Sequence, residues 1–301
     1  MSLENLSLVR KQSQPQRLSK VEWLAFAVLV ASAVLSFLAV PAQAGDGLLH
    51  VWFLDVGQGD AIFIQAPNGN QVLIDGGPDN KVLQELGRIM PFNDRSIDMV
   101  VLSHPHADHL RGLIEVLKNY EVGLMLENKI PCDSPECQEW HKVEQKSETI
   151  QAEAGEVADL GNGVQLKVLY ARQPDARANA AKNAHDYMVV SELEYGGETV
   201  LFMGDAEKNI EQSLIRANPD LRAQFLKIGH HGSKTSTTED FIRAISPLLA
   251  FIEVGARNSY NFPNPDVLTR LENHGIKYYR TDKDGTVELL LDGENYRVKN
   301  F

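Results

Sequence analysis

The sequence has few cysteines, no excess of basic charge and no internal repeat. Two cysteines among 301 residues cannot hold a disulfide-dense scaffold, so they form one local disulfide bond or stay as two free thiols. The 29 basic residues stand against 41 acidic ones, and the net charge of −12 argues against a broad basic face for nucleic acid. The lack of repeats and of biased composition excludes solenoid, collagen-like and disordered chains. The composition does not exclude a cleft whose positive charge comes from metal ions.

The first 44 residues differ from the rest of the chain. Four basic residues between positions 10 and 20 precede an uncharged run over residues 23–40, and Ala42-Gln43-Ala44 follows it. This order is typical of a signal peptide with a small-x-small cleavage site, yet the run is also close to the shortest membrane span. A cleaved signal and an uncleaved anchor are both open alternatives. In either case the positive-inside rule keeps the basic end in the cytoplasm and predicts that residues 45–301 are exported: secreted, periplasmic or membrane-anchored and facing outside.

Beyond this segment, short apolar runs alternate with amphipathic stretches. Strands and helices mixed throughout, with no clear linker, predict one α/β layered domain over residues 45–301. The charged, alanine-rich stretches at 144–156 and 175–182 are expected to be solvated surface. The strands are expected at 48–53, 61–65, 72–74, 99–102, 165–170, 188–195, 199–202, 225–228 and 249–253, and the helices at 81–90, 110–120, 207–217, 239–244 and 265–274.

The most informative segment is His104-Pro105-His106-Ala107-Asp108-His109, which follows an apolar run and precedes a helical pattern. Three imidazoles and one carboxylate within six residues place four metal-ligating groups on one turn. The chain has nine histidines in all, so chance does not account for this density. A solvated loop or a lone structural zinc is the alternative. The ligand types suit Zn, Fe or Mn.

Several segments together resemble the metallo-β-lactamase superfamily. The pattern His104-x-His106-x-Asp108-His109 has the form of that superfamily's first metal motif. Within the superfamily, the chain is similar to the C-terminal hydrolase domain of the ComEC competence proteins. The segments that carry this similarity are Phe53-Leu54-Asp55-Val56-Gly57-Gln58-Gly59-Asp60-Ala61, Leu73-Ile74-Asp75-Gly76-Gly77, Gly204-Asp205-Ala206-Glu207 and Leu226-Lys227-Ile228-Gly229-His230-His231-Gly232-Ser233.

The resemblance implies an αββα sandwich with a one- or two-metal site at the edge between its sheets. It assigns His104 and His106 to a first metal, and Asp108 and His109 to a second. Asp205 would bridge the two ions, since a carboxylate can bind both and offset their charge. His185 lies where the superfamily often has a third ligand for the first metal. The ComEC branch usually has serine there, so His185 is either a ligand or a loop residue.

The same resemblance brings one of two adjacent histidines into the site. We expect His230 to be a ligand of the second metal, and His231 to lie beside the substrate as a catalytic residue together with Asp108. The reverse order of the two histidines is the alternative. Gly232 and Ser233 would let the backbone approach an anionic substrate closely.

Three aspartates are expected to support the ligands. Asp75 would fix a ligand imidazole through its other ring nitrogen. Asp55 and Asp60, on a glycine-rich turn, would do similar work or shape the floor of the cleft, with ordinary turn chemistry as the alternative. The chain departs from the family at Phe262, which replaces the histidine of a common Gly-His-Pro element. An aromatic platform for a base or a sugar is one substitute for that contact.

Cys132 and Cys137 are separated by four residues in a proline-containing stretch. Export favours a disulfide between them, and a short loop of this size can close. A metal site is the alternative, but only His141 stands near the pair.

The implied cofactors are two divalent ions, Zn or Mn. Such ions lower the pKa of a shared water from about 15.7 toward about 7 and neutralise an anionic substrate, so hydrolysis needs no protein nucleophile. The first hypothesis is a phosphodiesterase or nuclease with a nucleic-acid substrate. The second is a hydrolase of small or cell-wall phosphodiesters or lactones, and the third is a non-catalytic accessory module of DNA uptake. A membrane is a further partner if the N-terminal segment is retained.

Overall fold

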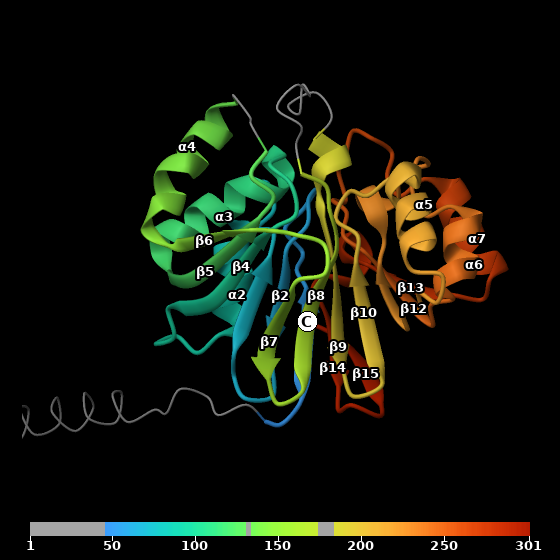
Figure 1. Ribbon diagram of the computed structural model, residues 1–301, viewed down its shortest axis with the longest axis horizontal. Coiled ribbons are helices and arrows are strands. Elements are labelled where there is room, and N and C mark those ends of the chain that lie inside the picture. Colours follow the sequence, from blue (N-terminus) through green and yellow to red (C-terminus); the bar gives the residue numbers. More distant parts are fainter. Residues whose placement is uncertain (1–45, 131–133, 174–183) are drawn as a thin grey trace, which may run out of the picture. The chain divides into compact units, whose positions relative to one another are not determined.

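Two twisted sheets stack face to face, and helices cover the outer side of each (Figure 1). The structure is a computed structural model that describes residues 46–130, 134–173 and 184–301. The expected export segment therefore lies outside the described residues, as do Cys132 and the stretch at 175–182. All described residues belong to one compact unit.

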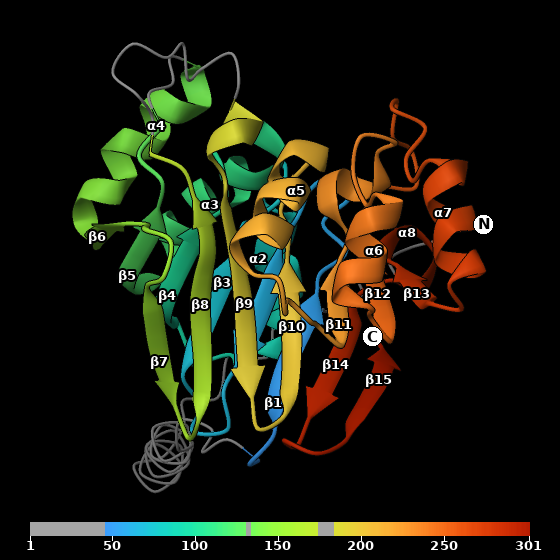
Figure 2. The same ribbon diagram turned by 45° about the vertical axis from the view of Figure 1, so that its right-hand side comes forward.

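The first sheet has eight strands and the second has seven (Figure 2). Their spatial orders are β15-β14-β1-β2-β3-β4-β5-β6 and β13-β12-β11-β10-β9-β8-β7. The strands of the first sheet are β1 Leu49–Phe53, β2 Ile62–Gln65, β3 Gln71–Ile74, β4 Ser96–Leu102, β5 Glu121–Glu127, β6 Glu148–Gln151, β14 Val287–Leu291 and β15 Tyr296–Asn300. Those of the second are β7 Val157–Gly161, β8 Val164–Ala171, β9 Val189–Tyr195, β10 Glu198–Phe202, β11 Phe225–Lys227, β12 Leu249–Ile252 and β13 Lys277–Arg280.

Three helices of at least nine residues lie on one side of the sandwich and three of at least seven on the other. The first group is α2 Lys81–Ile89, α3 Ala107–Asn119 and α4 Pro135–Val143, and the second is α5 Lys208–Ala217, α6 Glu239–Ile245 and α7 Pro265–Asn273. Shorter turns are η1 Glu144–Lys146, η3 Ala184–Tyr187, η4 Gly229–Gly232 and α8 Thr281–Asp284. Within the described ranges, no helix combines the length and the apolar character that crossing a membrane requires.

Alternation along the strands explains the layers. In β4, Met99 and Val101 enter the core between the sheets, whereas Val100 packs outward under the helices. Successive strand residues point to opposite faces of a sheet, so an uninterrupted apolar run is buried on both sides. The two sheets meet in a shared apolar core, where the rings of Phe53 and Phe251 stack at 4.0 Å. The architecture is thus the αββα sandwich that the resemblance implies.

The candidate residues gather where parallel strands end. β3 and β4 pair in parallel in one sheet, as do β10, β11 and β12 in the other. The carboxyl ends of parallel strands meet at one edge of a sheet, which is where α/β proteins commonly bind ligands. The turns that follow these strands carry the predicted ligands, and a backbone hydrogen bond of 2.8 Å from Val189 N to Ser103 O joins the two sheets there.

Candidate metal centre

A first cluster lies at the end of β4 and contains His104, His106, His185 and Asp205, whose ligand atoms lie within 4.8 Å of one another. His106 Nδ1 and His185 Nε2 are 3.0 Å apart. His104 Nε2 lies 3.8 Å from Asp205 Oδ2, and His185 Nε2 lies 3.9 Å from the same oxygen. His185 therefore joins the residues of the expected first metal.

A second cluster contains Asp108, His109, Asp205 and His231. Asp205 Oδ1 lies 3.4 Å from both His109 Nε2 and His231 Nε2. Asp108 Oδ2 lies 3.4 Å from His231 Nε2, and its side chain is one-third exposed. Asp108 thus marks the open side of a cluster whose other members are buried.

Asp205 stands between the clusters, with one carboxylate oxygen facing each. Oδ2 faces His104 and His185, whereas Oδ1 faces His109 and His231. This placement is compatible with the bridging role that the resemblance implies, and the role itself stays a prediction.

The residues present fit a pair of cations. His104 Nε2, His109 Nε2, His231 Nε2 and Asp205 Oδ1 are buried, and among the described residues none of these atoms has a hydrogen-bond partner. An unpaired buried polar atom costs about 1–3 kcal/mol, and here several such atoms converge. Imidazole nitrogens and carboxylate oxygens are ligands of first-row divalent metals, so a bound cation would satisfy them together.

The other ring nitrogens are held from behind, which aims Nε2 at the centre. His109 Nδ1 lies 2.8 Å from Asp75 Oδ2, and Asp75 also accepts a hydrogen bond from Ser103 N at 2.8 Å. His104 Nδ1 lies 3.0 Å from Ser103 Oγ. His231 Nδ1 lies 2.9 Å from the carbonyl oxygen of Glu253. Contacts of this kind fix the orientation of a ligand imidazole, and Asp75 has the place expected for it.

Asp60 also supports the second cluster. It is buried, its Oδ1 lies 3.2 Å from His231 Nδ1, and its Oδ2 pairs with Lys227. Burial lowers the pKa of Lys227, but the carboxylates of Asp60 and Glu253 outweigh this effect and raise it. Lys227 therefore stays charged and keeps a negative charge on Asp60 behind His231.

The two clusters differ in electrostatics. Burial and the neighbouring His185 lower the pKa of His106 to about 4. Burial also lowers the pKa of His231, but the carboxylates of Asp205 and Asp60 outweigh it and raise that pKa to about 10. The carboxylates around the second cluster therefore favour a positive charge beside them, which a protonated His231 supplies.

The two adjacent histidines lie in different clusters, which is the arrangement that stood as the alternative, although His230 Nε2 also lies 3.8 Å from Asp205 Oδ2. His231 lies with Asp108, His109 and Asp205, whereas His230 lies with His185 and Glu207. His230 Nδ1 is 3.1 Å from Glu207 Oε1. Both histidines have left-handed backbone, with φ of 48° and 53°, and this conformation turns two consecutive imidazoles toward different clusters.

Asp55 does not support the centre. Its carboxylate pairs with Lys81 at 3.0 Å and accepts a hydrogen bond from Gly57 N at 3.2 Å. This is the turn chemistry that stood as the alternative, because a carboxylate in a turn can bond the backbone two residues on.

The two residues expected to approach substrate have other contacts. Gly232 has a φ of +80°, and a Cβ there would lie 2.6 Å from Pro263 Cβ. The glycine therefore permits close packing on Pro263. The Ser233 hydroxyl lies 2.9 Å from Thr235 Oγ1. A substrate contact at either residue stays a prediction, as does the disulfide, of which the buried Cys137 on α4 is the described half.

Sequence reasoning missed Glu207, Lys227 and Glu253. Lys227 and Glu253 each interrupt or end an apolar run at a strand terminus, which is a recognisable signal, because charged residues are rarely buried unless paired.

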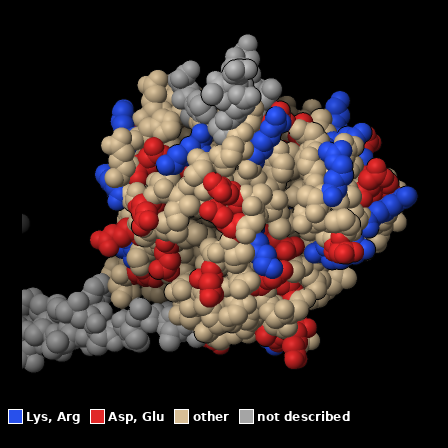
Figure 3. All heavy atoms as spheres, in the orientation of Figure 1, with Lys and Arg blue, Asp and Glu red and all other residues tan. Residues whose placement is uncertain are grey.

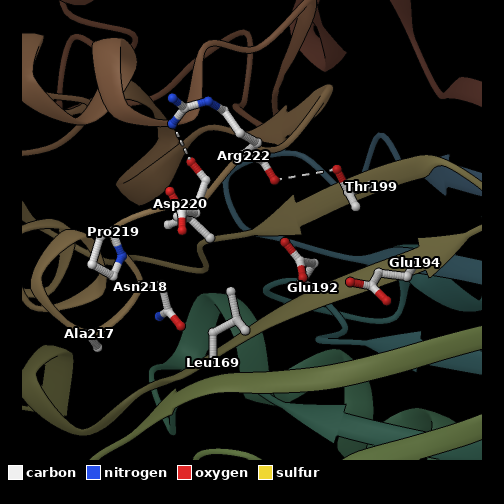
Figure 4. A pocket seen from close by; sticks show the side chains of 10 residues that line it. Leu169, Glu192, Glu194, Thr199, Ala217, Asn218, Pro219, Asp220 and Arg222 are labelled. Atoms are coloured by element: carbon white, nitrogen blue, oxygen red, sulfur yellow. Dashed lines mark hydrogen bonds between the residues drawn. The ribbon is translucent and has the colours of Figure 1, made fainter.

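A separate hollow beside β8, β9 and β10 (Figure 4) contains none of the cluster residues; it is lined by residues such as Glu192, Glu194, Thr199 and Arg222.

The αββα fold and the two ligand clusters place the protein in a class of metal-dependent α/β sandwich proteins. Residues 54–252 match the family model of the metallo-beta-lactamase superfamily, and the chain belongs to that superfamily.

Its relatives include a protein that is named for competence. The chain is 32% identical to "ComE operon protein 3" of Bacillus subtilis over 86% of this chain and 34% of that protein. It is 29% identical to "Competence protein ComA" of Neisseria gonorrhoeae over 88% of this chain and 35% of that protein. The chain thus spans about one third of the length of these relatives. Among solved structures, the metallo-beta-lactamase fold protein YhfI of Bacillus subtilis matches 77% of this chain and 96% of its own, with a TM-score of 0.52 and 12% identity.

Proposed function

We propose that this protein is a metal-dependent phosphodiesterase that acts on nucleic acid outside the cytoplasm. The observation that carries the proposal is the position of Asp205 between two ligand clusters, which together contain four buried ligand atoms that have no hydrogen-bond partner among the described residues. The relative named "Competence protein ComA" supports a nucleic-acid substrate, because competence is the uptake of DNA.

The residues divide the work by position. His104, His106 and His185 would hold one cation and Asp108, His109 and His231 the other, with Asp205 shared. Bound divalent ions, Zn or Mn, would supply an acidified water and neutralise the phosphate. Asp75 and the carbonyl oxygen of Glu253 orient the rings of His109 and His231, and Asp60 places a negative charge beside His231. The exposed edge at Asp108 leaves a way in for the substrate.

Bound metal ions would allow this acidic chain to bind an anionic phosphodiester. On the face seen in Figure 3, acidic and basic side chains are intermixed, and no broad basic patch covers the described part. Phosphate affinity would therefore come from the cations of the centre, which dominate the local field.

Turnover of bis-p-nitrophenyl phosphate by the purified protein, loaded with Zn or Mn, tests the proposal. We expect hydrolysis that falls at least about 100-fold in Asp205→Ala and in Asp108→Ala, because each removes a ligand of the second cation. Asp55→Ala is the matched control: it removes an aspartate of the same motif that contacts Lys81 instead, so activity should persist. Full metal occupancy without turnover would overturn the enzymatic proposal and favour an accessory role in DNA uptake.

A second candidate keeps the same centre but acts on small or cell-wall phosphodiesters or lactones. The net charge of −12 favours it, because a polyanion is repelled by an acidic surface. Degradation of single-stranded DNA at low salt supports the first candidate. Turnover of lactones or of teichoic-acid-type diesters without DNA degradation supports the second.

Export is part of the proposal. The basic, then apolar N-terminus predicts it. N-terminal sequencing of the mature protein would distinguish a cleaved signal from an anchor. Protease digestion of intact spheroplasts should remove residues 45–301 and would leave them untouched if the domain were cytoplasmic.

A further inference from the structure

We propose that Tyr260 and Phe262 form a stacking platform for a nucleobase beside the metal centre, and that the platform selects single-stranded nucleic acid. This inference rests on the proposed phosphodiesterase function and specifies its substrate.

The platform is an aromatic pair with one open face. The rings of Tyr260 and Phe262 stack with centroids 5.4 Å apart and planes 18° apart. Tyr260 is 64% exposed, whereas Phe262 is half-buried. An exposed ring that already stacks on its inner face offers its outer face to another planar group.

The pair lies directly beside the candidate ligands. The Phe262 ring meets the His230 ring edge-on at 5.5 Å and lies 6.4 Å from the His231 ring. A base on the platform would therefore belong to a nucleotide next to the phosphate held at the centre.

The loop that carries the rings is held in one shape by Asn258. Its Oδ1 accepts hydrogen bonds from Tyr260 N at 3.2 Å and Phe262 N at 2.9 Å. Its Nδ2 donates to Gly255 O and Phe262 O, both at 2.9 Å. A prearranged platform loses little conformational entropy on binding, which favours affinity.

The chemistry points to an unpaired base. Every nucleobase has a π-face that can stack on an aromatic side chain, and such stacking tolerates any sequence. Bases within a duplex are stacked on both sides, so they do not offer that face without being extruded. A lactone or a cell-wall phosphodiester has no such ring. Arg257, exposed in the same loop, adds a cation of the kind that single-strand-binding sites combine with aromatic rings.

The test compares two single-stranded oligomers of equal length, oligothymidylate and the same backbone with abasic sites. We expect the metal-loaded wild-type protein to have a KM about tenfold lower for oligothymidylate, which corresponds to about 1.4 kcal/mol and lies within the range of base–aromatic stacking. In Tyr260→Ala the ratio of the two KM values should fall to near one. Tyr260→Phe keeps the ring and should keep the ratio. Tyr296→Ala, which removes an exposed tyrosine of β15, should also keep it.

A measurement of oligomer binding distinguishes the proposed platform from the proposed phosphodiesterase activity. Fluorescence anisotropy of both labelled oligomers with metal-loaded Asp108→Asn protein reports the platform without turnover. If bis-p-nitrophenyl phosphate is not hydrolysed but Tyr260-dependent preference for the base-bearing oligomer appears, the phosphodiesterase proposal fails and the platform stands. If the diester is hydrolysed but both oligomers bind alike, or Tyr260→Ala leaves the preference intact, the platform is overturned.

Discussion

Lys227 has an uncommon position for a lysine, fully buried in β11 and paired with the carboxylate of Asp60. Removing one partner of a buried ion pair leaves an uncompensated charge, which costs about 3–5 kcal/mol. Lys227→Met should therefore lower the free energy of unfolding by about that amount, measured by urea denaturation. Lys81→Met breaks the half-exposed pair with Asp55 and should cost at most about 1 kcal/mol. Equal losses in the two variants would contradict this role for Lys227.

Individual ligands could be predicted from the sequence where spacing alone defines them. Spacing places His104, His106, Asp108 and His109 on one turn whatever the details of the backbone. It cannot separate His230 from His231, because their assignment depends on a left-handed φ at both positions. Asp55 and Asp60 share a turn, yet only Asp60 reaches His231, since the chain reverses direction between them.

At the scale of elements, α3 begins earlier than its apolar periodicity indicates. It starts at Ala107, not at residue 110, because the amphipathic pattern marks only the part of a helix that packs. The first turn of α3 therefore carries Asp108 and His109. This turn approaches the neighbouring strand end closely, with Gly76 N donating to His109 O at 2.8 Å.

Gly112 on α3 permits this approach. A Cβ at position 112 would lie 1.7 Å from Gly76 O, so Gly112→Ala must displace the helix. We expect a loss of about 3 kcal/mol in unfolding free energy and weaker metal binding, measured by chelator competition, because the ligands of α3 move with it. Gly87→Ala in α2 meets no atom within 4 Å and should stabilise by up to about 1 kcal/mol. Unchanged metal affinity in Gly112→Ala would show that α3 does not position the ligands.

Elements with mixed polarity were harder to predict. The stretch at 144–156 is solvated surface apart from the buried Ala152, but the sequence does not predict that it contains β6, an edge strand whose exposed and half-buried residues alternate. The segment forms a strand because it pairs with β5. Its β-propensity alone does not predict this, since β-propensity depends on the neighbouring strands. The helix α4 before it was not predicted, although Ser134 caps its first turn by accepting from Cys137 N at 3.3 Å.

Glu127 at the end of β5 makes the packing of α4 depend on pH. Burial and the nearby Glu144 raise the pKa of Glu127 to about 8, and Glu127 accepts a hydrogen bond from Trp140 Nε1 at 2.9 Å. The folded state therefore holds a proton that the unfolded chain releases near pH 4.5. This contribution to stability is full below about 4.5 and is lost as the pH rises through 8, with a total on the order of 4 kcal/mol. Urea denaturation between pH 5 and 9 should show the decline. Glu127→Gln should flatten it, and an equally steep decline in that variant would assign the effect to another group.

At the scale of the whole molecule, the sequence predicts the layered architecture. It does not predict the long-range contacts that bury the metal centre. Alternating runs are local and indicate an α/β layered domain, and the resemblance of the ordered motifs to the superfamily implies the αββα sandwich, without any contact being known. The centre joins the ends of strands from two sheets through contacts between residues far apart in sequence, such as the hydrogen bond of 2.9 Å from Ala61 N to Glu253 Oε1. Contacts of this range depend on how the sheets stack, and no short motif records that.

The stability of the whole domain should depend on divalent cations, because four buried ligand atoms of the clusters converge without a hydrogen-bond partner among the described residues. A ligand that binds the folded state alone, at 100 times its Kd, adds about 2.7 kcal/mol, which for a domain of this size raises Tm by about 5–10 °C. Thermal denaturation of chelator-treated protein, before and after Zn or Mn is restored, measures the shift. Asp205→Ala removes the residue shared by both clusters and should abolish most of the shift, whereas Asp55→Ala should keep it. A full shift in Asp205→Ala would place the bound cations elsewhere on the molecule.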